Sequence, residues 1–320
     1  MTDKPLNTST FIWDLTGEMR IVNTNKMNFC LDSTDRFLNN KYGKVIVYKR
    51  GAQKNQIWKI ANSSINNNKI ITDNSNRRLA SDKNGSVGAM SFFPENDLMF
   101  NWVIEQRVSE IDKIGFVCGE VYIKNAYNNK YLTLRDDNDI ILSDLTENNK
   151  GQIWFLFENK RIYHDVQSSH CVASPIEKMA DRSRYQFLKR TWINEQRKQE
   201  FTITNIRTSG VDDLDYEWVI FYSEASAAYS MESFRNRLIS RDGYAMVYLE
   251  NKYYDDQYWF IDLIPGYKDL YIITNIHDGK ILNATRVDGG KTIVKNYTLF
   301  STESNNNSQF WALKDFWLIG

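Results

Sequence analysis

Short apolar runs separated by polar turns recur along the whole chain, and they follow the period of β-strands rather than that of helices. Alternating runs such as Met19-Arg-Ile-Val22 and Val45-Ile-Val-Tyr48 place apolar side chains on one face of a strand. Runs of this kind return about every ten residues, which is the spacing of short strands joined by turns. The two best stretches of helical periodicity, 178–189 and 224–237, are weak, and we expect loops or short turns there. The pattern therefore predicts an all-β chain.

A Gln lies two residues before a large aromatic residue at five places, and each copy opens a short β-rich run. The copies are Gln56-Ile-Trp58, Gln152-Ile-Trp154, Gln199-Glu-Phe201, Gln257-Tyr-Trp259 and Gln309-Phe-Trp311, with a degenerate sixth copy at Phe100-Asn-Trp102. Successive aromatics lie about 44 to 58 residues apart, a period typical of repeat architectures. Each repeat holds about four short strands and ends on this motif, so the motif indicates architecture before it indicates a site.

Six four-stranded repeats are compatible with a six-bladed propeller or with two three-fold barrels in tandem. The sequence shows no exchange of strands between the terminal repeats, which a propeller uses for closure. A charge-rich junction follows the third motif at Glu158-Asn-Lys-Arg161, where the pattern restarts. We therefore predict two barrels divided near residue 159, each with three aromatics converging on one core.

The closing Gln-x-Trp, preceded by a hydrophobic-x-hydrophobic strand and repeated in threes, resembles the ricin B-type β-trefoil lectin family. The paired layout most resembles the haemagglutinin subunits of clostridial neurotoxin complexes, and the resemblance covers the chain from Gly17 onward. It implies an all-β fold of two tandem β-trefoil domains, residues 1–159 and 160–320. It also implies a lectin for galactose-type glycans that acts outside the cell, as a receptor-binding or accessory component of a bacterial toxin, with other toxin proteins as partners.

The resemblance also implies where a sugar would bind. In the ricin-type pattern an Asp follows the second strand, an aromatic ends the third strand, and an Asn directly precedes the Gln. The first repeat has all three, at Asp32, Tyr48 and Asn55, followed by Gln56. A carboxylate takes strong, charge-assisted hydrogen bonds from sugar hydroxyls, and an aromatic ring offers a flat apolar face to the sugar.

The sixth repeat matches this pattern less well, and we predict a weaker site there. Asn283 replaces the Asp, Tyr297 lies one place beyond the expected aromatic, and Ser308 precedes Gln309. The other four repeats depart further from the pattern and are expected to be structural; their acceptor positions hold Ala80, Thr133, Ala173 and Ile239.

Charge and composition exclude several other functions. Lys+Arg and Asp+Glu are balanced at 40 each, which leaves no basic field for nucleic acid. No apolar run approaches the 18 residues of a membrane span, so membrane insertion is not expected. Cys30, Cys118 and Cys171 give no disulfide framework and are expected to be free thiols. His164 and His170 lack further ligands at metal spacing, so we expect neither a metal nor a cofactor.

Two alternatives to a lectin remain open. An enzyme is disfavoured, because the chain has no G-x-S-x-G, HExxH or Walker motif, and the Asp136/Asp137 pair lies in a polar turn. A bridging subunit of a toxin complex without sugar binding is the stronger alternative, with residues 212–218 as its candidate contact surface. The first residues lack the charged and apolar segments of a standard signal peptide, so we expect export by another route.

Overall fold

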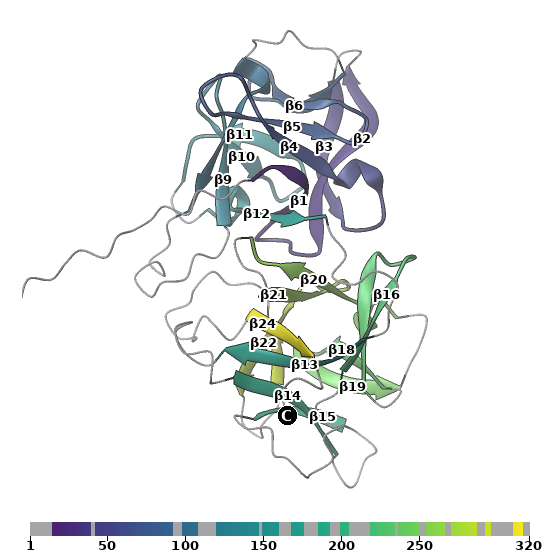
Figure 1. Ribbon diagram of the computed structural model, residues 1–320. Coiled ribbons are helices and arrows are strands. Elements are labelled where there is room, and N and C mark those ends of the chain that lie inside the picture. Colours follow the sequence, from purple (N-terminus) through teal and green to yellow (C-terminus); the bar gives the residue numbers. More distant parts are fainter. Residues whose placement is uncertain are drawn as a thin grey trace, which may run out of the picture.

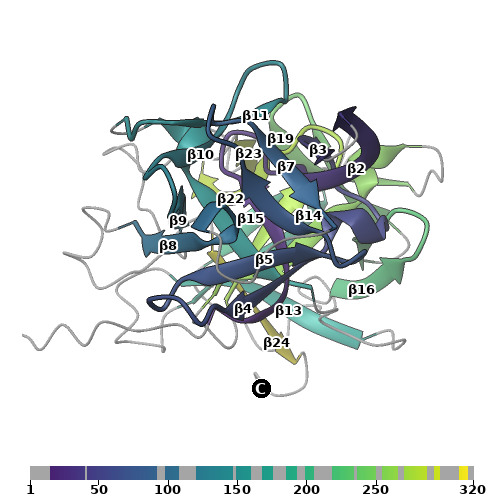
Figure 2. The same ribbon diagram turned by 90° about the horizontal axis from the view of Figure 1, so that it is seen from above.

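The computed structural model contains two all-β units. It describes residues 15–39, 42–91, 98–107, 120–146, 149–159, 168–175, 185–192, 199–204, 218–233, 236–249, 254–265, 270–286, 292–295 and 310–315. Figure 1 shows one unit above the other, and the two overlap in the view from above in Figure 2, so they are stacked. No helix within these ranges has the length and apolarity that a membrane span requires.

The first unit is a barrel closed by antiparallel pairs between neighbouring strands. Its ring runs in the order β1 (Gly17–Asn23), β4 (Trp58–Asn62), β5 (Lys69–Asp73), β8 (Trp102–Gln106), β9 (Glu120–Asn125) and β12 (Trp154–Glu158), and β12 pairs back with β1. Each repeat adds one hairpin to the ring: β2 (Phe29–Asn39) with β3 (Tyr42–Lys49), β6 (Arg78–Ser81) with β7 (Val87–Met90), and β10 (Tyr131–Leu134) with β11 (Ile140–Ser143). This ring with three hairpins is the β-trefoil topology.

The second unit repeats this arrangement. Its ring is β13 (Ser168–Pro175), β16 (Trp218–Ser223), β17 (Ala228–Ser233), β20 (Trp259–Leu263), β21 (Tyr271–Asn275) and β24 (Phe310–Asp315), which pairs back with β13. Its hairpins are β14 (Tyr185–Trp192) with β15 (Gln199–Thr204), β18 (Asn236–Arg241) with β19 (Tyr244–Leu249), and β22 (Ile281–Arg286) with β23 (Thr292–Lys295). The predicted fold of two tandem β-trefoils is therefore confirmed, and the division near residue 159 stays a prediction.

Within the described ranges, short 3-10 turns lead into four of the barrel strands and carry the Gln position of the motif. They are η1 (Lys54–Gln56), η2 (Leu98–Phe100), η4 (Lys150–Gln152) and η6 (Asp255–Gln257). The Trp that follows each turn begins a barrel strand, so its side chain points into the core.

Six tryptophans fill the two cores, and all are fully buried: Trp58, Trp102, Trp154, Trp218, Trp259 and Trp311. Five of them donate the indole N–H to a Leu carbonyl in their own repeat's hairpin at 2.9–3.0 Å; these acceptors are Leu31, Leu79, Leu132, Leu238 and Leu282. Buried Trp usually needs a partner for this N–H. Each Trp thus fixes the hairpin at the residue that precedes the acceptor position of its repeat.

The fourth repeat is closed by Trp218 and not by Phe201. The predicted copy Gln199-Glu-Phe201 lies in hairpin strand β15, whereas β16 begins at Trp218 and pairs with β13 and β17. His170 of β13 pairs with Trp218 as Met19 of β1 pairs with Trp58. The prediction was wrong here because this repeat keeps the Trp without the Gln, while an unrelated Gln-x-aromatic occurs in its hairpin.

The sequence prediction placed Ala173 in a hairpin strand, at the acceptor position of the fourth repeat, whereas the structure places it in barrel strand β13. Ala173 pairs with Ala312 of β24, so it lies in the ring and not at the acceptor position. The stretches 178–189 and 224–237, expected to be loops, include the start of β14, all of β17 and the start of β18. All these differences fall in the second trefoil, where the repeats depart most from one pattern.

The two trefoils pack against each other through strands that are buried on both faces. Side chains alternate along a strand, so Trp154 and Leu156 of β12 enter the first core while Phe155 and Phe157 face the second trefoil. Strands β1, β21 and β24 behave likewise. The resulting shared cluster contains Val22, Met27, Cys30, Phe155, Phe157, Ile264, Leu270, Ile272, Ile281, Phe310 and Ala312.

A buried ion pair crosses the same interface. Arg50 Nη1 and Nη2 donate to Asp262 Oδ2 and Oδ1 at 2.7 and 2.6 Å, and the guanidinium lies 3.8 Å from the centroid of the Phe260 ring. Asn28 of the first trefoil lies against Gly279 of the second, where a Cβ would come within 2.5 Å of Asn28 Oδ1. Gly279 also has a φ of +71°, so its backbone and its neighbour both require glycine.

Cys30 is a fully buried free thiol in the shared cluster. Burial in apolar surroundings raises its pKa to about 11, against an ordinary value of 9.0. Cys118 and the side chain of Cys171 lie outside the described residues, so their predicted free state stays a prediction.

The protein is expected to lose stability between pH 9 and pH 11 because of Cys30. In this window the unfolded chain releases the thiol proton while the folded chain keeps it, so the free energy of unfolding falls as pH rises, by up to about 3 kcal/mol. Urea unfolding at pH 8 and pH 10.5 measures the loss. The loss should be smaller in Cys30→Ala than in the unmodified protein, and equal losses would contradict the assignment.

Candidate functional site

Asp32 and Tyr48 lie on the same outer face of the β2–β3 hairpin. In the register of this hairpin Cys30 is opposite Tyr48 and Asp32 is opposite Ile46, while Leu31 between them points into the core. Diagonal neighbours on one face of an antiparallel pair lie about 7–8 Å apart. The side chains of Asp32 and Tyr48 are therefore diagonal neighbours on this face.

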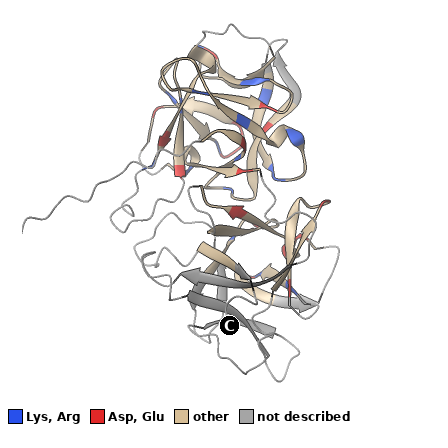
Figure 3. Cartoon of the chain, viewed as in Figure 1, with Lys and Arg blue, Asp and Glu red and all other residues tan. Residues whose placement is uncertain are grey.

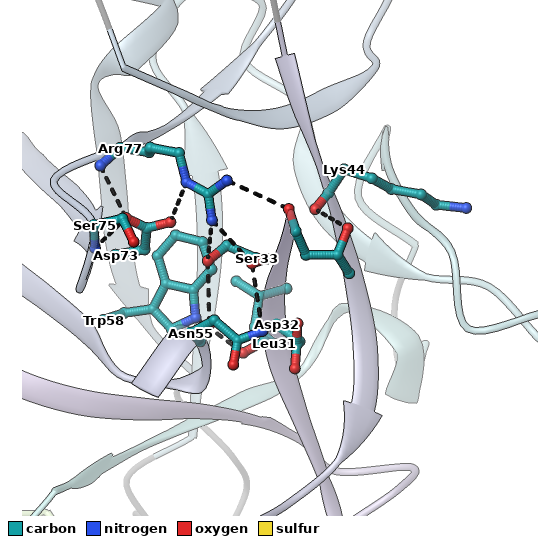
Figure 4. A network of polar contacts seen from close by, with 10 residues as sticks. Leu31, Asp32, Ser33, Lys44, Asn55, Trp58, Asp73, Ser75 and Arg77 are labelled. Carbon is teal, nitrogen blue, oxygen red and sulfur yellow. Dashed lines mark hydrogen bonds and ion pairs between the residues drawn. The ribbon is translucent and has the colours of Figure 1, made fainter. Parts of the chain in front are cut away.

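The carboxylate of Asp32 is held by two side-chain amides from the motif loop. Asn55 Nδ2 donates to Oδ1 at 2.7 Å, and Gln56 Nε2 donates to Oδ2 at 3.0 Å. Figure 4 shows Asn55 directly beside Asp32. A carboxylate offers about four acceptor positions, and these two amides occupy two of them. The amides therefore fix the orientation of the carboxylate.

The four predicted residues of the first repeat differ in their access to solvent. Tyr48 is 55% exposed and Asn55 is partly buried, whereas Asp32 is 4% exposed and Gln56 is fully buried. Tyr48 and Asn55 are thus the accessible members of this set, whereas Asp32 and Gln56 are buried.

Gln56 is also a structural residue of its loop. Its amide nitrogen donates to one backbone carbonyl and its oxygen accepts from one backbone N–H, both at 2.9 Å. Gln152 of the third repeat makes the same two kinds of contact in its own loop, and it reaches the Thr133 hydroxyl at 3.1 Å where Gln56 reaches Asp32. The two repeats share a scaffold and differ in the acceptor that the scaffold holds.

The sixth-repeat prediction falls largely outside the described residues. Asn283 is fully buried and lies opposite Ile293, as Asp32 lies opposite Ile46. Tyr297 and Gln309 are not among the described residues, so this second site stays a prediction.

Two residues that the sequence prediction missed lie against the first-repeat site. Ser33 Oγ donates to the carbonyl of Asn55 at 3.2 Å, and Arg77 of the second repeat donates to both the carbonyl and the hydroxyl of Ser33. Figure 4 shows Arg77 reaching from the second repeat toward Ser33. The one sequence signal is the spacing of Asp73 and Arg77, which form a buried ion pair four residues apart.

Charge in the described part of the molecule gives no sign of another site type. Figure 3 shows Lys and Arg interspersed with Asp and Glu over the described strands. The described residues contain no group of three His, Cys, Asp or Glu side chains that could hold a metal ion. The side chains of His164 and His170 lie outside these residues.

Comparison with known proteins gives similarities to solved structures, whereas no family model and no curated protein matches the chain. A mosquitocidal holotoxin matches 93% of this chain at 18% identity and a TM-score of 0.46, and the match covers 34% of that chain. The chain therefore spans about a third of the length of the holotoxin.

Two further structures match at 14% identity and a TM-score of 0.35. The designed 3-fold symmetric protein ThreeFoil matches 43% of this chain over 96% of its own. A non-toxic homologue of type II RIPs from Momordica charantia (bitter gourd), in complex with α-methyl-D-galactoside, matches 93% of this chain over 97% of its own. These similarities concern the fold, and none of them identifies a family for the chain.

Proposed function

We propose that the chain is a lectin that binds galactose-type glycans through its first repeat. The observation that carries this proposal is the carboxylate of Asp32, which two amides orient on the same hairpin face as the exposed ring of Tyr48. The carboxylate suits a pair of adjacent hydroxyls, and the ring suits the apolar C–H face of the sugar. Galactose fits because its 3- and 4-hydroxyls lie at one edge and leave one face of the ring largely apolar.

The wider role that we propose is a receptor-binding or accessory component of a bacterial toxin that acts outside the cell by binding and without catalysis. Cell-surface glycans would be its ligands, and assembly with partner proteins would raise a weak single-site affinity. The support for this role is the sequence resemblance. The bridging alternative relied on residues 212–218, and Trp218 of that segment is fully buried in the second core.

Truncation of Asp32 to Ala is expected to weaken glycan binding more than tenfold, because each hydrogen bond to a charged group contributes about 1.5–3 kcal/mol. Asp32 also holds the buried Gln56, so its loss is expected to cost about 1–3 kcal/mol of stability as well. Tyr48→Ala is the cleaner probe, since its exposed ring can be removed with little effect on folding.

Titration of lactose against the folded variants, after a glycan array has ranked ligands, is the measurement. Tyr127→Ala is the matched control, because Tyr127 is similarly exposed (47%) in the third repeat and should bind as the unmodified protein does. Unchanged binding by both Asp32→Ala and Tyr48→Ala would reject the first-repeat site in favour of the sixth repeat or the bridging role.

A further inference from the structure

In three places among the described residues, an Asn at the end of a repeat's first strand holds the motif loop of the neighbouring repeat in the barrel. Its side-chain nitrogen donates at 2.8–3.4 Å to the two carbonyls that flank the Gln position: Asn23 to Gly151 and Ile153, Asn125 to Met99 and Asn101, and Asn275 to Asp256 and Tyr258. Its oxygen accepts the backbone N–H two residues further on. This contact is a repeated joint between neighbouring repeats.

The joint that ends at the candidate site is built differently. The second repeat has Asp73 where the first, third and sixth repeats have Asn, and a carboxylate has no N–H to offer the carbonyls of Asn55 and Ile57. Asp73 accepts instead from the backbone N–H of Ser75 at 2.9 Å and from Arg77 Nε at 2.7 Å. The usual donor to the loop of the first repeat is therefore missing.

Arg77 replaces that donor indirectly, as Figure 4 shows. Its buried guanidinium donates to the carbonyl and the hydroxyl of Ser33 at 3.0 and 3.2 Å. The Ser33 hydroxyl donates in turn to the carbonyl of Asn55 at 3.2 Å, which is the carbonyl that an Asn at position 73 would reach. The side chain of Asn55 then holds Asp32 at 2.7 Å.

We infer that Asp73 and Arg77 are positioning residues for the first-repeat site. They keep the Asn55 amide and the Asp32 carboxylate in one orientation before a ligand arrives, which lowers the cost of ordering them on binding. Within the first trefoil, this altered joint ends at the repeat whose sequence has the full set of Asp, aromatic and Asn. The inference rests on the proposed function for the identity of the ligand, and on the hydrogen bonds above for the positioning.

Lactose titration of Arg77→Leu is the first test. The affinity for lactose is expected to fall about tenfold. This is the effect of losing the free energy of about one hydrogen bond, which here orients the site. Because Arg77→Leu leaves the carboxylate of Asp73 buried without its partner, the double variant Asp73→Asn/Arg77→Leu accompanies it. Asn at position 73 can form the joint found in the first, third and sixth repeats, so the double variant should bind within about threefold of the unmodified protein.

Arg107→Leu is the matched control for loss of an ion pair. Arg107 pairs with Glu120 at 2.9 Å in the same trefoil, and both side chains are largely buried. Its removal should leave lactose affinity unchanged. If Arg77 acted only on stability, the affinity for lactose would follow the stability of all three variants. Binding that is restored in the double variant and unchanged in Arg107→Leu therefore indicates a positioning role.

A readout without ligand separates this inference from the proposed function. Hydrogen exchange of the Asn55 side-chain amide, followed by nuclear magnetic resonance, should accelerate about tenfold in Arg77→Leu and recover in the double variant, because the orientation of this amide depends on the joint. If the unmodified protein binds no glycan, the proposed function fails and this exchange rate still decides the positioning role. Unchanged exchange and affinity in folded Arg77→Leu would overturn the inference and leave the lectin proposal standing.

Discussion

Truncation of Trp58 to Ala is expected to lower the free energy of unfolding of the first trefoil by about 3–5 kcal/mol. Trp58 has no exposed surface, packs in the core with Trp102 and Trp154, and donates its indole N–H to the carbonyl of Leu31 at 2.9 Å. The truncation leaves a cavity at the centre of the three-fold barrel and also removes the bond that fixes the hairpin.

Trp58→Phe separates these two contributions, because Phe keeps most of the ring volume and lacks the N–H. It is expected to cost about 1–2 kcal/mol, near the contribution of one buried hydrogen bond. Denaturant unfolding monitored by fluorescence and by circular dichroism gives both values, and Tyr127→Ala supplies a surface control. A loss below about 1 kcal/mol for Trp58→Ala would contradict the central place of Trp58 in the core.

The barrel and its core could be predicted from the sequence because the same pattern of short apolar strands and a closing aromatic recurs along the chain. Trp58, Trp154, Trp259 and Trp311 each lie two residues after a Gln, and their recurrence identified the inward position of one strand in four of the six repeats. The three-fold arrangement followed, because such a residue must be buried with its equivalents. Asp32, Tyr48 and Asn55 were predicted from the family resemblance, and the structure places Asn55 within hydrogen-bond distance of Asp32.

The fourth repeat shows the limit of a local motif. A hairpin strand and a barrel strand both alternate side chains between two faces, so Gln199-Glu-Phe201 in β15 looks like a closing strand in the sequence. Pairing partners distinguish the two, and pairing is not a local property. Trp218 was overlooked because its repeat lacks the Gln and is longer than the others.

The sequence of strand β12 carries a signal for the interface between the trefoils. Strand β4 alternates buried and exposed positions, whereas in β12 the four residues from Trp154 to Phe157 are all apolar and all buried. A continuous apolar run is typical of a strand covered on both faces, so β12 could have been assigned to an interface. Contacts such as Arg50 with Asp262 or Arg77 with Ser33 leave no such signal, because each joins residues that are far apart in the chain.

Replacing Asp262 by Ala is expected to lower the free energy of unfolding by about 3–5 kcal/mol, the usual cost of removing one partner of a buried ion pair. The side chains of Arg50 and Asp262 are 3% and 9% exposed, so the guanidinium of Arg50 would stay buried without its carboxylate. Its contact with the Phe260 ring would remain, but an aromatic face replaces a bidentate carboxylate poorly. The two trefoils are then expected to unfold in separate steps.

Two controls distinguish a buried charge from loss of packing. Lys49→Ala removes the exposed pair between Lys49 and Asp255 across the same interface and should cost about 0–1 kcal/mol. The double variant Arg50→Met/Asp262→Leu removes both buried charges and fills their space, so it should recover most of the stability lost in Asp262→Ala. If Asp262→Ala costs no more than Lys49→Ala, water reaches Arg50 and the interface is open in solution. A large loss of stability in Asp262→Ala, recovered in the double variant, would mean that the two trefoils meet in a closed contact without water. Such a contact keeps the first-repeat site and the second trefoil in one body.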